Sequence, residues 1–110
     1  MDQRGVVILS VSRGGSEERV ASTAVVLAVL LGVELDEERA RELLREAVSN
    51  GYARMDGDVY RLTAEGERLY ASLREELKRL RRNDALSALE MIELISIDDL
   101  KELAHRAGKG

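Results

Sequence analysis

The apolar positions of the chain first indicate a helix that other elements enclose. Its second half, AVVLAVLL, is apolar on nearly every side, which is typical of a helix buried in a core. Ser16 precedes it as a favourable N-cap, and the acidic Glu17 and Glu18 suit a helix N-terminus. Gly32 follows as a residue that ends helices. The pattern therefore predicts a central core helix over about residues 16–31.

A second helix is predicted from Asp36, another favourable N-cap, to about Ser49. Its apolar residues recur at i, i+3, i+4, i+7 and i+8, and this spacing places them in one stripe: Ala40, Leu43, Leu44, Ala47 and Val48. The opposite face is charged. Asn50-Gly51 closes the helix, because both residues tolerate the left-handed backbone conformation.

The segment GYARMDGDVYRL predicts a hairpin of two short strands, with Asp56-Gly57 as its two-residue loop. Helical spacing returns at Thr63, which is placed to cap a helix that reaches about Arg82. This helix carries its apolar residues on one face: Leu69, Tyr70, Leu73, Leu77 and Leu80.

Both ends of the chain are less regular. Asn83-Asp84 predicts a break, followed by a helical region from Ala85 to about Ala107. This region is expected to break again near Ser96, where Ser-Ile-Asp-Asp resembles a helix start. At the N-terminus, VVILSV is rich in β-branched residues and fits a strand, but it also fits a short helix.

Composition is typical of one folded domain with a helix-rich aliphatic core. The chain has 110 residues, of which 45% are apolar and 35% charged, and it contains three Tyr but no Phe or Trp. The absence of Cys excludes disulfides and thiolate chemistry, and it favours a cytoplasmic location. We expect no membrane span, because the longest apolar run is short, and no signal peptide, because no small-residue cleavage site follows Asp2.

The chain offers little of the chemistry that enzymes use. His105 is the only histidine, and its position in a last helical turn indicates an exposed cation. No carboxylate pair stands apart from the surface charges, and Gly14-Gly15-Ser16 lacks the Gly-Lys-Ser/Thr of a phosphate-binding loop. We therefore expect no enzymatic activity, no metal and no cofactor.

The order helix, short turn, helix, hairpin and helix is that of a winged helix-turn-helix. Leu31-Gly32-Val33, Gly51-Tyr52 and Tyr60-Arg61-Leu62-Thr63 with Gly66 resemble the MarR and PadR groups of transcription regulators. This resemblance covers about Ser16 to Tyr70, and it favours a first helix at VVILSV. The expected fold is mainly α with a small β-hairpin wing, an α+β winged helix-turn-helix with a C-terminal helical extension.

The resemblance also divides the chain. It implies a winged-helix domain over residues 1–70, in which residues 1–14 stay open, and a long helix with a C-terminal helical dimerisation region over residues 63–107. Within the wing, Thr63 is expected to cap the following helix and Gly66 to let that helix approach the hairpin. Leu62 and Tyr60 are expected to pack in the core.

In these regulators the helix before the wing enters the DNA major groove, and the wing contacts the backbone or the minor groove. Carried onto this chain, the resemblance implies double-stranded DNA as partner, with groove contacts from Arg39, Arg41 and Arg45 and wing contacts from Arg54 and Arg61.

The charge balance argues against strong phosphate binding. The net charge is −4, and five acidic residues lie between Asp36 and Glu46. The three arginines of the second helix also fit a solvated face of i, i+3 and i, i+4 ion pairs. A further basic group lies at the end of the long helix, where it suits either a helix C-terminus or a phosphate contact: Lys78, Arg79, Arg81 and Arg82.

The C-terminal region carries more apolar residues than one helix face buries easily, since Met91, Leu94 and Ile97 lie outside its main stripe. Such a surface is typical of an interface. Together with the resemblance, it predicts a homodimer through Leu86, Leu89, Ile92, Leu94, Ile95 and Ile97.

Two functions follow as hypotheses. The first is a dimeric winged-helix protein that binds DNA, a small transcription regulator. The second is a winged helix that serves as a protein-protein interaction module in a larger assembly, which the net acidity favours. The abundance of Arg and Glu suits a thermophile, although a GC-rich genome also favours arginine codons.

Overall fold

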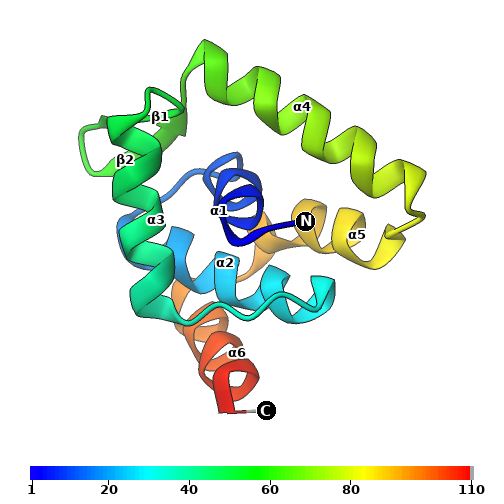
Figure 1. The fold of residues 1–110 in the computed structure, drawn as a ribbon. Helices are drawn as coiled ribbons and strands as arrows, with labels where there is room; N and C mark the ends of the chain where they lie inside the picture. The colour runs from blue at the N-terminus through cyan, green and yellow to red at the C-terminus, as the bar shows by residue number, and fades with distance from the viewer. Residues whose placement is uncertain (110) are drawn as a thin grey trace.

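The computed structural model describes residues 1–109, with side chains for residues 1–107. The fold is mostly helical and holds a two-stranded antiparallel sheet (Figure 1). The order of the elements is α1 (Gln3–Val11), α2 (Glu17–Leu31), α3 (Glu37–Ser49), β1 (Ala53–Asp56), β2 (Val59–Leu62), α4 (Ala64–Arg79), α5 (Asn83–Met91), the 3-10 turn η1 (Ile92–Leu94) and α6 (Ile97–Lys109). This is the predicted helix-rich α+β fold with a hairpin wing.

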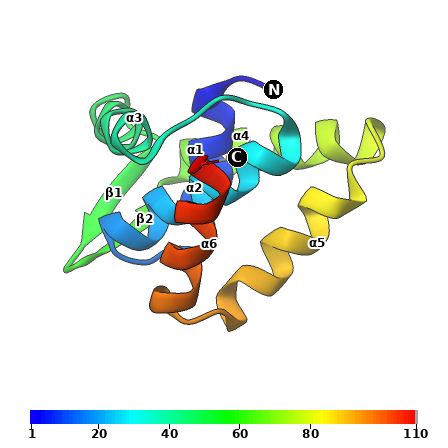
Figure 2. The same cartoon turned by 90° about the horizontal axis from the view of Figure 1, so that it is seen from below.

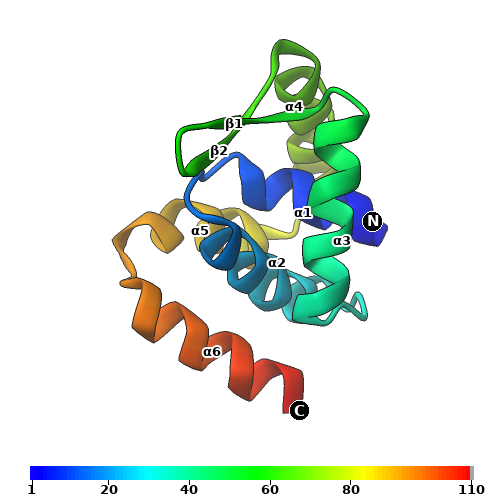
Figure 3. The ribbon, with the colours of Figure 1, turned by 90° about the vertical axis from the view of Figure 1, so that its left-hand side faces the viewer.

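Helix α2 lies at the centre of the molecule, as its apolar sequence predicts. Helices α1 and α6 lie on opposite sides of it (Figures 1 and 3), α3 and α5 also contact it, and α6 crosses in front of it when the molecule is seen from below (Figure 2). Ser16 caps its start by accepting a hydrogen bond from the Arg19 amide at 3.2 Å. Gly32 ends it in the left-handed conformation with φ 68°.

The N-terminal segment VVILSV forms helix α1, which decides between the strand and the helix that its sequence permits. Asp2 caps this helix by accepting from the Gly5 amide at 2.9 Å. Every residue from Gly5 to Val11 is buried, because α2, α3 and α4 all contact α1. Burial on all sides outweighs the weak preference of β-branched residues for strands.

Helix α3 and the hairpin follow the predicted pattern with one correction. Asp36 caps α3, accepting from the Arg39 amide at 2.7 Å. The hairpin pairs Asp56 with Val59, so its loop is Gly57-Asp58, one residue later than predicted. Gly57 has φ 66°, and a positive φ at the first loop position is the requirement of a type II′ turn. Because glycine adopts a positive φ without strain, the two-residue loop begins at Gly57 and not at Asp56.

Helix α4 begins as predicted and ends earlier. Thr63 accepts a hydrogen bond from the Gly66 amide at 3.1 Å and so caps the helix. The helix stops at Arg79, not Arg82, because Arg81 adopts a left-handed φ of 56° and turns the chain back. The Arg82 amide then donates to the Leu77 carbonyl at 2.9 Å, which satisfies a carbonyl at the helix end.

The C-terminal region packs on the core more completely than its sequence predicts. It breaks at Ser96, whose hydroxyl caps α6 by accepting from the Asp99 amide at 3.2 Å. Leu89 and Ile92 are buried within the chain, and α6 buries Leu100 and Ala104. Within residues 1–109 no helix combines the length and the apolar sequence that crossing a bilayer requires.

The assignment of Leu89 and Ile92 to a subunit interface is therefore wrong for this conformation, since the chain's own core covers both side chains. Leu86 and Ile95 are half-buried against the same core, and Ile97 is half-buried on α6. Leu94 is the exception, with 84% of its surface exposed. Met91, which precedes it in the same region, is also exposed. An apolar surface remains, but it is smaller than predicted.

Gly66 allows α4 to lie directly against the hairpin entry. A Cβ at this position would overlap the Tyr52 carbonyl oxygen and lie 2.9 Å from the carbonyl carbon. We expect Gly66→Ala to lower the free energy of unfolding by about 3 kcal/mol, because backbone cannot move aside easily. Denaturant unfolding followed by circular dichroism measures the change.

Gly5→Ala is the matched control, because it adds the same methyl group within a helix. Its Cβ would meet only side-chain atoms, with Met1 Cγ at 2.9 Å and Leu73 Cδ2 at 3.3 Å. These side chains can rotate, so the loss should be about 1 kcal/mol or less. Equal losses for the two variants would contradict a specific backbone contact at Gly66.

Candidate nucleic-acid interface

The arginines of α3 lie on the outer side of that helix. Arg39, Arg41 and Arg45 lie on the surface that remains after the buried residues of the helix pack inward. The buried residues are Ala40, Leu43, Leu44 and Ala47. Figure 3 looks onto this side of the molecule, with α3 and the hairpin in view. Arg45 is the most open of the three, with 65% of its side chain exposed.

Each of these arginines has a carboxylate partner within the chain. Arg39 pairs with Glu42 at 2.9 Å, and Arg41 pairs with Glu37 at 3.0 Å. These are the i, i+3 and i, i+4 pairs that the alternation of Glu and Arg predicts. The guanidinium groups on this face are therefore already engaged.

Glu17, at the start of α2, is a partner that the sequence does not reveal. Its carboxylate lies 3.3 Å from Arg45 and 3.5 Å from Arg41, so it links α2 to α3. The pKa of Arg41 is raised, first by its hydrogen bond to Glu37 and then by the charges of Glu37, Glu17 and Glu18, although burial opposes this. The packing of α2 on α3 creates these pairs, and no local spacing signals them.

Glu18 extends the same charged group to α6, where it forms an ion pair with Lys101. The hydrogen bond and charge of Lys101 lower the pKa of Glu18 below its ordinary value of 4.5. The same contacts raise the pKa of Lys101. The start of α2 thus carries two carboxylates that hold three cations from α3 and α6.

The wing arginines lie at a different place. Arg54 and Arg61 face each other across the hairpin, and Arg61 pairs with Asp56 at 3.1 Å. Both line a hollow of about 350 Å³, and Arg13 from the loop after α1 reaches it too. Among the residues described, Arg54 forms no ion pair.

Arg13 is a basic residue that the sequence does not single out. Its guanidinium lies 3.5 Å from Glu93 and donates to the Tyr70 hydroxyl at 3.4 Å. Glu67 also lines the hollow, which reduces its positive charge. A hydrogen bond from the Tyr60 amide to the Gly15 carbonyl, at 2.8 Å, joins this loop to the hairpin. Such a long-range contact has no signature in the sequence.

The structure therefore divides the predicted DNA-binding residues into two groups. Arg41 and Arg45 gather around Glu17, with Arg39 on the same helix, and the wing pair shares its hollow with Arg13. No residue of α3 lines that hollow. A single ligand can contact both groups of arginines only if it is long enough to span them.

The basic residues at the end of α4 have partly structural roles. Arg82 donates to the Leu30 carbonyl and pairs with Asp84 at 3.2 Å, so it joins α2 to the turn before α5. Lys78 pairs with Glu75 at 3.3 Å, whereas Arg79 and Arg81 are exposed. Throughout residues 1–109, no group of His, Cys, Asp and Glu side chains is arranged to hold a metal ion.

The ion pair between Glu18 and Lys101 makes a prediction about pH. A carboxylate whose pKa is lower in the folded state adds stability above its unfolded pKa, and this stability is lost as pH falls through the folded pKa. We therefore expect Lys101→Gln to lower the melting temperature at pH 7. The difference from the parent protein should shrink as pH falls below about 4.5.

Glu18→Gln provides the control, because it removes the titrating group. In that background, the effect of Lys101→Gln should depend much less on acid pH, because only the weaker interactions of Lys101 with the charges of Asp98 and Glu37 remain. Melting curves between pH 3 and pH 7 for the four proteins measure this. A loss that stays constant across the pH range in the parent background would contradict the pairing.

Comparison with known proteins gives no match. No protein-family model matches this chain, and no match was found among the curated proteins or the solved structures. The resemblance to the MarR and PadR groups accordingly rests on the sequence motifs and on the order of the elements.

Proposed function

We propose that this protein binds double-stranded DNA as a homodimer and acts as a small transcription regulator. One observation carries the proposal. Helix α3 is held by a buried apolar stripe, so its opposite face is open and presents Arg39, Arg41 and Arg45. The major groove of DNA admits an α-helix, and arginine is the side chain that most often contacts guanine there.

Binding in this mode requires the arginines to exchange partners. Exposed ion pairs contribute about 0–1 kcal/mol each, so a phosphate can replace the carboxylate of Glu42 beside Arg39. Arg54 needs no exchange, because it lacks an ion-pair partner among the described residues. Glu17 and Glu18 oppose phosphate contacts near the start of α2. The expected affinity is therefore modest and depends strongly on salt.

The interaction-module hypothesis keeps support from the same face. All three α3 arginines are neutralised within the chain, and the net charge is −4. A protein partner with a basic surface would meet a favourable field there. DNA binding remains our first choice, because the wing arginine Arg54 and the outer face of α3 are both accessible.

The first experiment measures duplex affinity against salt. If Arg39, Arg54 and Arg61 of each subunit contact phosphates, log affinity should fall with log salt at a slope of about −5. Arg54→Ala should reduce the magnitude of this slope by roughly 2 in a dimer. Arg74→Ala on α4 is the control, since it removes an exposed arginine outside both groups, and it should leave the slope unchanged.

The second experiment releases the α3 arginines. Glu17→Gln removes the shared partner of Arg41 and Arg45, so duplex affinity should rise by about threefold to tenfold at low salt. Glu75→Gln removes a carboxylate on α4 and should have no such effect. Absence of duplex binding by the parent protein and by Glu17→Gln at about 50 mM salt would leave the interaction-module hypothesis in place.

The third experiment tests the dimer. Leu94 is 84% exposed and is the strongest remaining candidate for a subunit contact. Sedimentation velocity at micromolar concentration should show a dimer for the parent protein and a monomer for Leu94→Glu. Leu80→Glu is the control and should leave the dimer intact, because Leu80 is also exposed but lies at the end of α4, outside the predicted interface. A parent protein that stays monomeric would contradict the dimer.

A further inference from the structure

The turn that joins α4 to α5 carries positive charge that the proposed function does not use. Its cationic side chains lie in the last turn of α4 and just after it: Lys78, Arg79, Arg81 and Arg82. Lys78 and Arg82 pair with carboxylates, whereas Arg79 and Arg81 form no ion pair among the residues whose side chains are described. In a protein of net charge −4, this turn is a local excess of positive charge.

The backbone of the turn has the Schellman pattern, in which glycine is the usual residue. The Arg81 amide donates to the Lys78 carbonyl at 3.1 Å, and the Arg82 amide donates to the Leu77 carbonyl at 2.9 Å. Between them, Arg81 adopts a φ of 56°, and no other residue except glycine has a positive φ in the part of the chain that the structure describes. Glycine would adopt this conformation without the strain that a side chain adds. Folding alone would therefore favour glycine at this position.

Favourable charge at a helix end explains only part of the basic run. Cations stabilise a helix within its last turn, so Lys78 and Arg79 suit the end of α4. Arg82 has a structural contact, since it donates to the Leu30 carbonyl of α2. Arg81 lies beyond the end of the helix and is exposed. Its side chain is therefore available to a partner.

An exposed apolar side chain lies among these cations. Leu80 stands between Arg79 and Arg81 in the chain, and 60% of its surface is exposed. A suitable partner therefore presents carboxylates for the guanidinium groups and an apolar side chain for the leucine. A protein segment that mixes acidic and apolar residues offers both, whereas the phosphates of DNA offer only charge. An anionic membrane fits less well, because the net charge of the protein is −4 and a single leucine adds little insertion.

The turn lies far from the surface that is proposed to bind DNA. Helix α4 begins at the end of the hairpin, and its 16 residues extend for about 24 Å at 1.5 Å per residue. Figure 1 shows α3 and the hairpin on one side of the molecule and the turn between α4 and α5 on the other. DNA bound to α3 and the wing would leave this turn uncovered.

We propose that the turn between α4 and α5 binds an acidic segment of another protein, in which carboxylates alternate with apolar side chains. The carboxylates would pair with Arg79 and Arg81 in the bidentate geometry that guanidinium groups favour, and an apolar side chain would cover Leu80. Such a small surface supports a weak, salt-sensitive interaction. The proposal is independent of DNA binding, because it uses none of the arginines assigned to DNA.

Fluorescence anisotropy tests the proposal with a short labelled peptide in which single leucines separate pairs of glutamate. We expect a dissociation constant of about 10–100 μM at about 50 mM salt. The same peptide with glutamine in place of glutamate should bind at least about tenfold more weakly, because it cannot form ion pairs. No binding of the acidic peptide up to about 1 mM, or equal binding of the two peptides, overturns the proposal.

Arg81→Gly separates binding from folding, because the two should change in opposite directions. Glycine removes the strain of the left-handed conformation, so the melting temperature should rise by about 2–5 °C. The affinity for the acidic peptide should fall by about threefold to tenfold, because one guanidinium group is lost. A lower melting temperature would show that Arg81 serves the fold, and unchanged peptide affinity would show that it does not bind the peptide. Either result overturns the proposal.

Arg68→Ala is the matched control, since it removes an exposed arginine from the opposite end of α4. It should leave the peptide affinity unchanged, whereas Arg79→Ala should weaken it by about threefold to tenfold. Equal losses would indicate attraction to overall charge. Vesicles that contain phosphatidylserine and duplex DNA test the other anionic partners, and binding of either that Arg81→Gly abolishes would assign the turn to phosphate groups. Each of these results overturns the proposal.

Discussion

The enclosure of α2 is the constraint on which the other features of this molecule depend. The chain has no Phe or Trp, so its core consists of helices that approach one another through small and aliphatic side chains. Ala21, Ala24 and Ala28 are almost fully buried on α2 and provide this close approach. Because α1 and α6 occupy opposite sides of α2, the C-terminal helix is part of the same core as the winged-helix segment. Arg19 on α2 stabilises this packing, because its guanidinium donates hydrogen bonds to the Ile92 and Ile95 carbonyls, before α6, at 2.7 and 2.9 Å.

The same packing determines the charge of the outer face of α3. Since α2 crosses beneath α3, the carboxylate of Glu17 emerges between Arg41 and Arg45, and Glu18 meets Lys101 on α6. Acidic residues at a helix N-terminus stabilise the helix. Here they also compete with any phosphate for the arginines of α3. For the proposed DNA binding, these two carboxylates would therefore weigh against affinity while they stabilise the start of α2.

Local signals in the sequence predict most of the secondary structure. Ser16, Asp36 and Thr63 all cap helices as expected, because a cap depends only on residues within one turn. What the sequence does not predict depends on contacts between distant segments. The pairing of Glu17 with Arg45 and the approach of Arg13 to the wing arise only after the helices pack. The burial of Leu89 and Ile92 also depends on contacts between distant segments. An apolar stripe indicates that a helix face is buried, but it does not indicate whether the same chain or a second subunit buries it.

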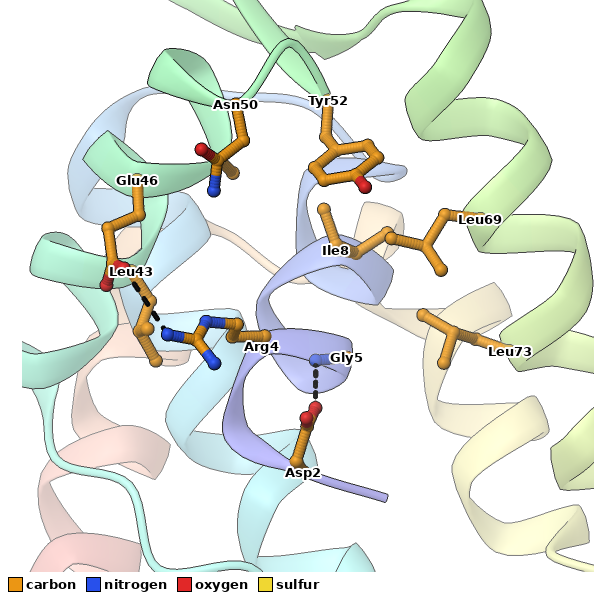
Figure 4. A pocket seen from close by; sticks show the side chains of 11 residues that line it. Asp2, Arg4, Gly5, Ile8, Leu43, Glu46, Asn50, Tyr52, Leu69 and Leu73 are labelled. Atoms are coloured by element: carbon orange, nitrogen blue, oxygen red, sulfur yellow. Dashed lines mark hydrogen bonds and ion pairs between the residues drawn. The ribbon is translucent and has the colours of Figure 1, made fainter.

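The position of α4 connects the aliphatic core to a cavity. This helix is fixed at one end by Gly66, which lies against the Tyr52 carbonyl, and at the other by the buried Leu77. The two anchors are about 16 Å apart along the helix axis, at 1.5 Å per residue. Between these anchors, Leu69 and Leu73 are only partly buried against the core. Both leucines also line the cavity of about 310 Å³ beside α3 (Figure 4), so the helix that closes the aliphatic core is also one wall of this cavity.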